Sequence, residues 1–579
     1  MNADRLLALY EQVAEAPDAF ARLRRFVLDL AVRGKLVPQE AGDEPALELL
    51  KRIAAEKARL VKVGEIRKPR DLANGEDLEP PFDIPASWRW CRLDTVGAII
   101  GGGTPSAGDP ENFAEPGEGI PWLTPADLGG FRELFIERGS RDLTEKGLAS
   151  SSATMMPAGT VLFTSRAPIG YVAIAANPIS TNQGFKSIVP YVDDCSRFIA
   201  LAMQTFAPEI DANAPGTTFK EVSGKIVAGV PFPLPPLAEQ RRIVAKVEEL
   251  MALLDRLEAA RIAREATRDR LTAASLVRLT APDTDPTDFP ANARFALTTL
   301  PALTTRADQI KPLRQTILNL AVRGKLVEQD PTDEPASEFL DKLHSKASKK
   351  KKTARALPAK HAAEMPFECP PGWAWAQVRQ ILVSDRDISY GVIKLGPEPK
   401  SGGVPTLRCS DVRPGFIDLA GVRKVQESIE ADYARTRLEG GEVVINIRGT
   451  LGGVALVPDD LKGHNVAREV AVIPIAADLS GPFLVYLMLS PYFWDHIQSN
   501  LRGIAYKGLN LGILRSLPIP LPPIAEQHRI VAKVDALMAL CDRLEAALTT
   551  ADTTRARLLE ALLHEALEPA ATPATEAAE

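Results

Sequence analysis

Two stretches of the chain place apolar residues at alternating three- and four-residue steps. The first contains Ile243, Val247, Leu250, Leu254 and Leu257, and the second continues the same spacing from Ile530 to Leu562. Such steps form the seam of a heptad repeat, here with charged residues outside it. The pattern predicts two long helices, the first over 237–271, that pack on each other as an antiparallel coiled coil. The alternative is that each amphipathic helix packs only on its own domain.

Shorter apolar runs, rich in β-branched residues and bounded by Gly, Pro, Asn or Asp, fill the segments between these helices. Such runs are typical of strands; examples are Gly159–Phe163, Tyr171–Ala175, Gly441–Ile447 and Val454–Val457. Helical spacing occurs at Ser196–Ala207 and Pro482–Ser490. The sequence therefore predicts an α/β fold of the mixed α+β type.

Several segments of the chain occur twice in the same order. Leu30–Val37 recurs letter for letter as Leu320–Val327, and a Pro-Phe pair followed by two tryptophans also has two copies. Pro231–Gln240 matches Pro518–Gln527, and both continue as R-I-V-A-K-V. This is the signature of an internal repeat. These repeated segments form a duplicated frame around two segments whose sequences diverge. This arrangement indicates two related sites that recognise similar but unequal targets.

These boundaries predict seven regions along the chain. They are an N-terminal helical frame (1–80), a first variable domain (81–235), a first long helix (236–280), a linker with a repeat of the frame (281–365), a second variable domain (366–522), a second long helix (523–568) and a disordered tail (569–579). Prolines and threonines make Ala281–Thr305 the expected linker. The lysines at 349–352 predict a solvated loop, with a phosphate or partner contact as the alternative.

The composition narrows the class of protein. The chain has 579 residues, 45% of them hydrophobic and 25% charged, which is typical of a globular protein with several domains. The formal net charge of −6 excludes a uniformly basic surface but leaves a local basic cleft open. We find no membrane-spanning run and no signal-peptide pattern, so we expect a cytoplasmic protein. The five cysteines and six histidines lack disulfide-framework or zinc spacing.

Weak parallels between the variable domains point to a binding surface. Ser165-Arg166 matches Ile447-Arg448, and Lys220 matches Lys507 on a Gly-led loop. Arginine can fork onto guanine, Asn or Gln can pair with adenine, and lysine neutralises phosphate. The predicted DNA-contacting residues are Thr104, Ser106, Thr124, Ser165, Arg166, Asn182, Gln183, Lys220, Lys394, Arg408, Ser410, Arg448, Asn465, Arg468, Tyr506, Lys507 and Asn510. For any single one, the alternative is an ordinary surface or turn residue.

Recognisable catalytic motifs are missing from the sequence. It has no G-x-x-x-x-G-K-[ST] phosphate loop, no N-P-P-[FY] motif that would hold a target adenine and no G-x-S-x-G nucleophile elbow. The Gly-rich stretch Gly101–Ser106 lacks the lysine and predicts a turn. We therefore assign no catalytic, cofactor-binding or metal-binding residue to this chain and expect it to organise other subunits.

The duplicated segments resemble those of the specificity subunits of type I restriction–modification systems. The resemblance covers nearly the whole chain and is carried by Leu30–Val37, Leu320–Val327, Pro233–Val247 and Pro520–Val534, with weaker similarity at Gly101–Ser106 and Pro121–Leu128. It implies two target-recognition domains, each of which reads one half of a split, asymmetric DNA sequence. It also implies a pseudo-twofold internal repeat, in which paired helices set the length of the unread gap.

The resemblance further implies partners that perform the chemistry. Two methyltransferase subunits would methylate adenine N6 with S-adenosylmethionine and flip the target base themselves. A restriction motor-nuclease subunit would bring ATP and Mg²⁺. The N-terminal region Met1–Pro80 exceeds the minimal frame, and we expect it to dock a methyltransferase.

Two other classes of function stay open at this stage. The chain could be a DNA-modifying enzyme whose motifs are not recognisable, since many of its Asp and Glu residues have no assigned role. It could also be a coiled-coil scaffold that binds only proteins, which would suit the heptads and the net negative charge. Salt-sensitive binding to duplex DNA without activity of the chain alone would separate both from the recognition subunit.

Overall fold

The computed structural model describes residues 13–66, 79–216, 220–281, 287–348, 367–383, 385–501 and 508–567. The chain divides into two compact units: unit 1 comprises Met1–Ile262 and Asp552–Glu579, and unit 2 comprises Ala263–Ala551. Two helices of 44 residues cross this division, α8 (Leu237–Thr280) and α16 (Ile524–Leu567). Both units combine sheets with helices, which confirms the predicted mixed α/β class.

The described part of unit 1 contains three sheets. Their strand orders are β2-β10-β7-β8-β5, β3-β6-β4-β9 and the small ladder β1-β11. The strands are β1 (Arg89–Arg92), β2 (Gly97–Gly101), β3 (Phe113–Ala114), β4 (Ile120–Leu123), β5 (Phe135–Ile136), β6 (Arg141–Leu143), β7 (Val161–Ser165), β8 (Ile169–Ala175), β9 (Ser180–Thr181), β10 (Lys186–Pro190) and β11 (Pro231–Leu234).

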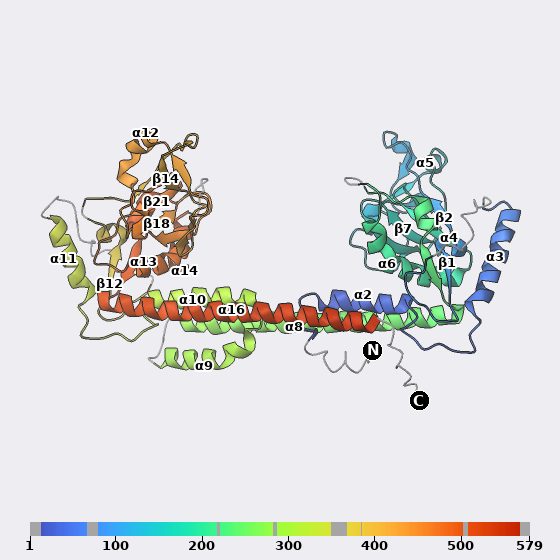
Figure 1. The fold of residues 1–579 in the computed structure, drawn as a ribbon, viewed down its shortest axis with the longest axis horizontal. Helices are drawn as coiled ribbons and strands as arrows, with labels where there is room; N and C mark the ends of the chain where they lie inside the picture. Colours follow the sequence, from blue (N-terminus) through green and yellow to red (C-terminus); the bar gives the residue numbers. More distant parts are fainter. Residues whose placement is uncertain are drawn as a thin grey trace, which may run out of the picture. The chain divides into compact units, whose positions relative to one another are not determined.

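Helix α6 (Ser196–Ala212) covers the larger sheet of unit 1 (Figure 1). Its Phe198 is fully buried and makes edge contacts with Trp88 and Phe232, at ring-centroid distances of 6.0 and 5.8 Å. Helix α2 (Ala19–Val32) packs on the other side of α6. The remaining helices of unit 1 are α3 (Ala46–Lys62), α4 (Leu93–Val96), α5 (Glu145–Ala149), α7 (Gly224–Ala228) and the 3₁₀ turns η2 (Pro110–Asn112), η3 (Pro125–Leu128) and η4 (Asp193–Cys195).

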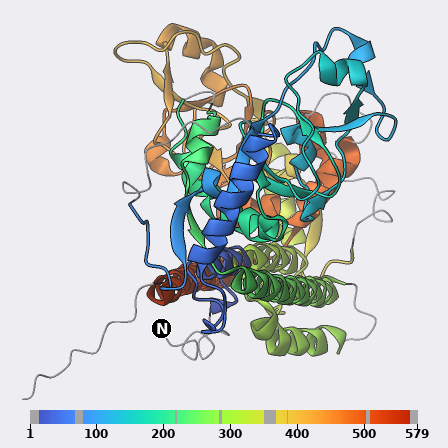
Figure 2. The same ribbon diagram turned by 90° about the vertical axis from the view of Figure 1, so that its right-hand side faces the viewer.

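Helix α3 lies along the outside of unit 1, toward the viewer in Figure 2, and buries Ala46, Leu49 and Ile53. The same core contains residues from the beginning of α8 and the end of α16. Ile243 and Val247 of α8 share it with Leu559 and Leu562 of α16. Predicted heptad residues of both long helices are thus buried in one core within unit 1.

Unit 2 repeats this plan with shorter strands. Its described sheets have the orders β13-β21-β18-β19, β17-β14-β20, β12-β22 and β15-β16. The strands are β12 (Ala374–Gln377), β13 (Ser389–Tyr390), β14 (Val404–Leu407), β15 (Val412–Arg413), β16 (Phe416–Ile417), β17 (Arg423–Val425), β18 (Val443–Asn446), β19 (Val454–Leu456), β20 (Asn465–Val466), β21 (Val470–Ile473) and β22 (Pro518–Leu521).

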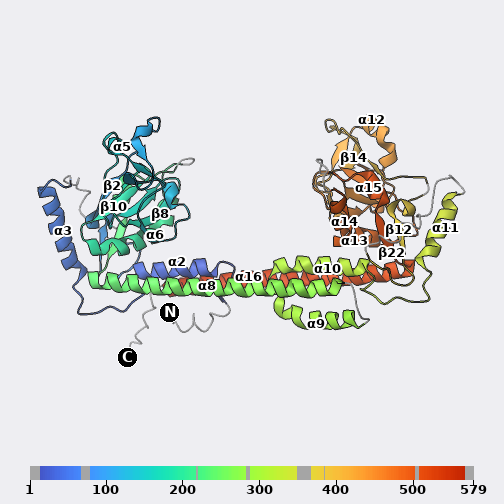
Figure 3. The same cartoon turned by 180° about the vertical axis from the view of Figure 1, so that it is seen from behind.

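Helices α13 (Gly481–Leu489) and α14 (Pro491–Leu501) lie between the larger sheet of unit 2 and α10 (Ile310–Val322), as seen in Figure 3. Fully buried Phe483 and Phe493 fill this layer. The other helices and turns of unit 2 are α9 (Asp288–Leu303), α11 (Ala336–Ser348), α12 (Glu427–Glu430), α15 (Leu511–Ser516), η5 (Ala307–Gln309), η7 (Val378–Ile381), η8 (Ala431–Thr436) and η9 (Asp459–Leu461).

The strand orders show that the two units share one topology. The series β2-β10-β7-β8 corresponds to β13-β21-β18-β19, and β6-β4-β9 corresponds to β17-β14-β20. In both units the middle strand of the smaller series pairs in parallel with the last, β4 with β9 and β14 with β20. The sequence duplication is therefore also a duplication of fold, including the segments whose sequences barely match.

The repeated octapeptide Leu30–Val37 ends helix α2. Gly34 has a φ of +67°, and Gly324 in the second copy has a φ of +69°. A Cβ on Gly34 would lie 2.5 Å from Pro85 Cγ and 3.1 Å from Trp88, so only glycine fits this position. The octapeptide is thus repeated because it closes a helix against the Pro and Trp that enter each variable domain.

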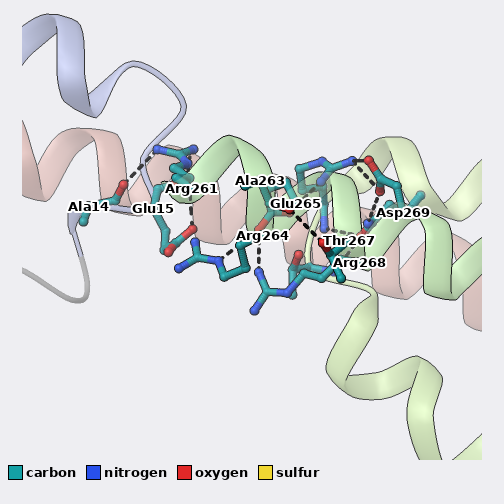
Figure 4. Close-up of polar contacts among 12 residues, drawn as sticks. Ala14, Glu15, Arg261, Ala263, Arg264, Glu265, Thr267, Arg268 and Asp269 are labelled. Carbon is teal, nitrogen blue, oxygen red and sulfur yellow. Dashed lines mark hydrogen bonds and ion pairs between the residues drawn. The ribbon is translucent and has the colours of Figure 1, made fainter. Parts of the chain in front are cut away.

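Figure 4 shows polar contacts on α8 in each of the two units. In unit 1, the Arg261 guanidinium donates to the carbonyls of Ala14 at 2.8 Å and Ala16 at 3.0 Å. In unit 2, Glu265 accepts from Arg268 and Arg306, and both bonds help to lower the pKa of this partly buried carboxyl. The bonds of Arg261 attach the segment at residues 14–16 to the middle turns of α8, and the bond from Arg306 attaches the segment that follows α9.

Most elements predicted from the sequence are confirmed, with shifted ends. The four example strands correspond to β7, β8, β18 and β19, the two example helices to α6 and α13, and the first long helix extends nine residues beyond Leu271 to Thr280. Within the expected linker Ala281–Thr305, the structure has a helix instead of an irregular connection: Asp288–Leu303 forms α9. Its Phe289, Ala293, Ala296 and Leu300 pack on the end of α8, and this burial outweighs the proline at 301.

Candidate nucleic-acid interface

In unit 1, the predicted Arg166 lies just after strand β7, in a fixed backbone position. The Ser165 N–H donates to the carbonyl of Gly184 at 2.7 Å, and the Ser165 carbonyl accepts from Val222 N–H at 2.9 Å. These bonds join the ends of three chain segments beside Arg166. The Arg166 side chain is about one-third exposed, and its Nη1 lies 3.6 Å from Glu221 Oε2.

The predicted amides Asn182 and Gln183 follow strand β9 and reach the same place. Asn182 N–H donates to the carbonyl of Leu123, the last residue of β4, at 2.8 Å. The Gln183 side chain is exposed, and its Oε1 accepts a short hydrogen bond from the hydroxyl of Thr104. Thr104 is held there because Gly103 N–H donates to the carbonyl of Thr181 at 2.9 Å. Two predicted residues from distant segments are thereby brought together.

An open groove of about 900 Å³ collects much of the predicted set in unit 1. Its lining includes Thr124, Arg166, Asn182, Lys220 and Glu221. Lys220 Nζ donates to the carbonyl of Asp211 at 2.8 Å, so its ammonium is tethered beside the groove. We call Thr104, Arg166, Asn182, Gln183 and Lys220 the first strand-end cluster.

Three further predicted residues in unit 1 have structural partners. Ser165 is fully buried, which excludes a direct base contact from its side chain and corrects that prediction for this conformation. The Thr124 hydroxyl donates to Asp127 Oδ2 at 2.7 Å, within a capping box for η3. The carbonyl of Ser106 accepts from Asn112 Nδ2 at 3.1 Å while its side chain is exposed.

Lys186 is a functional candidate that the sequence argument missed. Its side chain is only 17% exposed, with Nζ 3.9 Å from Glu221 Oε1 and 3.3 Å from the carbonyl of Gln183. Burial lowers the pKa of Lys186. Lys186 is the first residue of β10, and no motif around it in the sequence indicates a function. Its contact with Gln183 depends on how the loop between β9 and β10 folds.

In unit 2, Arg448 occupies the position after strand β18. The Ile447 N–H donates to the carbonyl of Glu469 at 2.8 Å, and the Ile447 carbonyl accepts from Leu509 N–H at 2.8 Å. The Arg448 side chain is exposed. Asn446, the last residue of β18, is buried and donates to the carbonyls of Cys409 and Val412 at 3.0 and 3.1 Å, which fixes this turn against the next loop.

Arg468 and Lys394 lie on chain segments that end beside the segment of Arg448. Arg468 N–H donates to the carbonyl of Val392 at 2.9 Å, and Val392 N–H donates to the carbonyl of Val466 at 2.8 Å. The side chains of Arg468 and Lys394 are both exposed. We call Lys394, Arg448 and Arg468 the second strand-end cluster, because the backbone bonds bring their three chain segments together.

Arg408 and Ser410 are tied to one carboxylate. Arg408 Nη2 donates to Asp411 Oδ1 at 3.2 Å and to the carbonyl of Gly421 at 2.6 Å, while Ser410 Oγ donates to Asp411 Oδ1 at 2.8 Å. The bond to Asp411 raises the pKa of Arg408. These two side chains support the turn, and their role as DNA contacts stays a prediction.

Two predicted amides in unit 2 serve the fold. Asn465 is fully buried and bonds Thr436 Oγ1 at 2.7 Å and Glu430 Oε1 at 2.8 Å, so its prediction as a DNA contact is wrong for this conformation. A polar residue at a strand end looks the same in sequence whether it faces solvent or the interior. Asn510 caps α15 by accepting from Gly512 N–H at 2.7 Å. The predictions for Tyr506 and Lys507 lie outside the described residues.

The backbone bonds establish which positions correspond between the units. Ser165 and Ile447 make the same pair of bonds, so Arg166 and Arg448 are equivalent, as the sequence parallel predicted. The glycines that follow, Gly170 and Gly452, have φ of +102° and +103°. Each unit therefore presents an arginine on the same scaffold, with different side chains around it.

Other kinds of site find no support in the part of the chain that the structure describes. No group of three or more His, Cys, Asp or Glu side chains there could hold a metal ion. No described helix is both long and apolar enough to cross a bilayer. All five cysteines are free thiols.

Comparison with known proteins identifies the class. The family model described as the type I restriction modification DNA specificity domain matches residues 85–266 and 393–551. These ranges contain β1–β11 and β14–β22 and include all residues of the two strand-end clusters. This chain belongs to the family of type I restriction–modification specificity subunits.

Two relatives from Escherichia coli agree with this assignment. The EcoAI specificity subunit of Escherichia coli is 30% identical over 570 residues, which cover 94% of this chain and 93% of the relative. The EcoEI specificity subunit of the same species is 28% identical over 571 residues, with the same coverage. The crystal structure of the HsdS subunit from Thermoanaerobacter tengcongensis aligns with 84% of this chain and 98% of its own, at 20% identity and a TM-score of 0.40.

Proposed function

We propose that this chain recognises DNA for a type I restriction–modification complex, with each unit reading one half of a bipartite, asymmetric target. The observation that carries the proposal is the equivalence of Arg166 and Arg448 within one repeated scaffold. A shared scaffold would place a side chain toward DNA in the same way twice. Different neighbours would then select different bases, as an asymmetric target requires.

The chemistry of the two clusters supports contact with a duplex. Each combines exposed cationic side chains with hydrogen-bonding groups at strand ends, which suits phosphate positioning together with base readout. In unit 1, Glu221 and Asp211 lie beside the basic residues Arg166 and Lys220. These carboxylates hold the cations in place before DNA arrives and would be exchanged for phosphate or base acceptors on binding.

The long helices supply the spacing in this proposal. Helices α8 and α16 are both 44 residues long, or roughly 66 Å at about 1.5 Å per residue, close to two turns of B-DNA. We infer that they pair as an antiparallel coiled coil and hold the two recognition units a fixed number of base pairs apart. The shared core of Ile243 and Leu559 in unit 1 supports this pairing.

The proposal assigns catalysis to partner subunits. Two methyltransferase subunits would bind S-adenosylmethionine and modify adenine, and a motor-nuclease subunit would use ATP and Mg²⁺, in a cytoplasmic complex. This chain would contribute no catalytic residue. Helix α3 is our candidate for methyltransferase docking, because Leu47 in its first turn and Val63 just after its end are about half exposed.

The test is co-expression of this chain with its neighbouring methyltransferase in a methylation-free host, followed by mapping of methylated adenines. We expect a split motif with a fixed gap that disappears when this chain is omitted. Methylation that does not depend on the chain would contradict the proposal. The purified chain alone, given S-adenosylmethionine and duplex DNA, should not methylate.

Substitutions in each unit then test which half-site that unit recognises. Arg166→Ala and Arg448→Ala should weaken recognition of opposite half-sites, each by about 1–3 kcal/mol if the arginine contacts a base in bidentate fashion. Arg197→Ala is the matched control, because Arg197 lies on α6 and pairs with Glu248 of α8. Equal effects of both variants on both half-sites would overturn the division of labour.

A further inference from the structure

The turn after β9 in unit 1 and the turn after β20 in unit 2 carry different side chains at one equivalent position. In unit 1, Gln183 follows Asn182, whose N–H bonds Leu123, and precedes Gly184, whose carbonyl accepts from Ser165. Gln183 therefore stands between two fixed backbone bonds, one to the end of β4 and one to the end of β7.

Arg468 stands between the same two bonds in unit 2. The preceding Ala467 N–H bonds the carbonyl of Leu407, the last residue of β14, at 2.8 Å. The following Glu469 accepts from Ile447, the residue after β18, at 2.8 Å. Gln183 and Arg468 are thus structurally equivalent, although no local similarity in sequence aligns them.

A conserved close approach behind the turn strengthens this equivalence. Gly102 and Gly391 face the turn in the two units, and a Cβ on either would lie within 2.0 Å of a backbone oxygen, of Asn182 or Val466 respectively. A residue larger than glycine would therefore collide with the turn in either unit. The turns that carry residues 183 and 468 are thus packed in the same way against a glycine.

The two side chains offer different hydrogen-bonding patterns. Gln183 presents an exposed amide whose Oε1 is held by the Thr104 hydroxyl. An amide held in this way can accept from adenine N6 while its Nε2 donates to N7. Arg468 presents an exposed guanidinium that forms no side-chain hydrogen bond or ion pair with another described residue. A guanidinium can donate a fork to guanine O6 and N7.

Other equivalent positions differ as well; Asn182, for example, corresponds to the fully buried Ala467. Arg166 and Arg448 are the same residue type, and Arg408, the counterpart of Thr124, is tied to Asp411. At the 183/468 position both side chains are exposed and differ in chemistry, while the backbone bonds that flank them are the same.

We propose that Gln183 and Arg468 read equivalent base pairs of the two half-sites in the major groove, Gln183 an A·T pair and Arg468 a G·C pair. This inference rests on the proposed function. Thr104 is a positioning residue, since it acts by orienting the Gln183 amide.

The test is an exchange of the two residues in the co-expressed methyltransferase complex, read by mapping methylated adenines. Arg468→Gln should convert one base of one half-site from G to A, and Gln183→Arg should convert one base of the other half-site from A to G. Each change should alter the preference between the two bases by about 5- to 150-fold. The unaltered half-site shows that the complex still folds and assembles.

A conservative variant separates base reading from charge. Arg468→Lys keeps the positive charge without the fork and should relax the G preference at that one position. If Arg468 only contacts phosphate, Arg468→Lys would keep the motif, and Arg468→Gln would lower binding of all sequences and flatten its salt dependence. That pair of results would overturn the inference.

Loss of methylation in a variant is resolved by measuring complex binding to a library of duplexes. A preference lost or switched at one base supports the inference, and an unchanged preference contradicts it. Failure of the wild-type complex to select any split motif would instead overturn the proposed function, so the two failures are distinguishable.

Discussion

Lys35 Nζ donates a hydrogen bond to the carbonyl of Leu567 at 2.7 Å. Leu567 is the last residue of α16, where carbonyls have no partner within the helix. In unit 2, Lys325 Nζ donates to the carbonyl of Ala281, just past the end of α8, at 3.1 Å. Each copy of the repeated octapeptide thus places a positive charge at the C-terminal end of a long helix, where the helix dipole is negative.

Replacing this lysine should loosen the end of the helix. We expect Lys35→Met to cost about 1 kcal/mol locally and to speed amide hydrogen exchange in the last turns of α16 by roughly fivefold. Lys51→Met is the control, because Lys51 Nζ donates to Glu48 on the exposed face of α3. Unchanged exchange at the end of α16 would show that the Lys35 bond does not stabilise it.

The glycine before each of these lysines should resist substitution. Gly34→Ala introduces both a positive-φ alanine and a clash with Pro85, and we expect a loss of about 2–4 kcal/mol in the free energy of unfolding. Gly64→Ala has the same backbone penalty at φ +79° but meets open space, so it should cost only about 1 kcal/mol. Denaturant unfolding followed by tryptophan fluorescence measures both. Equal losses would contradict the packing argument.

An ion pair in unit 1 should make stability depend on pH. Arg242 donates to both carboxylate oxygens of Asp43, at 3.2 and 2.6 Å, and the hydrogen bond to Arg242 lowers the pKa of Asp43. A lowered carboxyl pKa in the folded state stabilises the protein above the unfolded pKa of about 3.9, and this stabilisation is lost as the pH falls through the lowered pKa.

Asp43→Asn should therefore cost about 2 kcal/mol at neutral pH. Its difference from the wild type should shrink on acidification below about pH 4, when the wild-type carboxyl is also protonated. Arg242→Met also removes the ion pair with Glu40 at 3.3 Å, so the double variant should lose no more than Arg242→Met alone. A difference that stays constant from pH 7 to acid would refute the assignment; urea unfolding at each pH measures it.

Lengthening both long helices should widen the unread gap. Insertion of one heptad after Ile262 in α8 and another after Ala551 in α16 leaves the contacts within each unit intact, because these residues end the unit segments. Each helix becomes roughly 10 Å longer, which corresponds to about three base pairs. The mapped motif should keep both half-sites with a gap longer by that amount. Insertion in α8 alone should abolish methylation, and an unchanged gap in the double insertion would refute the spacing role.

The sequence predicted the parts of the fold that depend on local periodicity. Heptad spacing located α8 and α16, and β-branched runs located β7 and β18, because burial on one face imposes a regular pattern. It missed α9, whose apolar Phe289 and Leu300 are spaced for a helix but are interrupted by threonine and proline. There, packing on the end of α8 decided the structure.

The candidate site was predictable only in part. The Arg166 and Arg448 positions were found because short motifs around them survive in both units. The match of Gln183 with Arg468 was not, since it is defined by backbone bonds to strands far away in the chain. Asn465 was misassigned for a related reason: its partners Thr436 and Glu430 approach only through tertiary folding.

The division of the chain into units has a consequence for its synthesis. Ile243 and Val247 belong to unit 1, yet the Leu559 and Leu562 that complete their core come from the far end of the chain. All of unit 2 is translated in between, which takes roughly 15–60 s at about 5–20 residues per second. During that interval the core of unit 1 contains the residues made before α8 but lacks those that the last turns of α16 contribute, so unit 1 is completed only when synthesis of the chain is nearly finished.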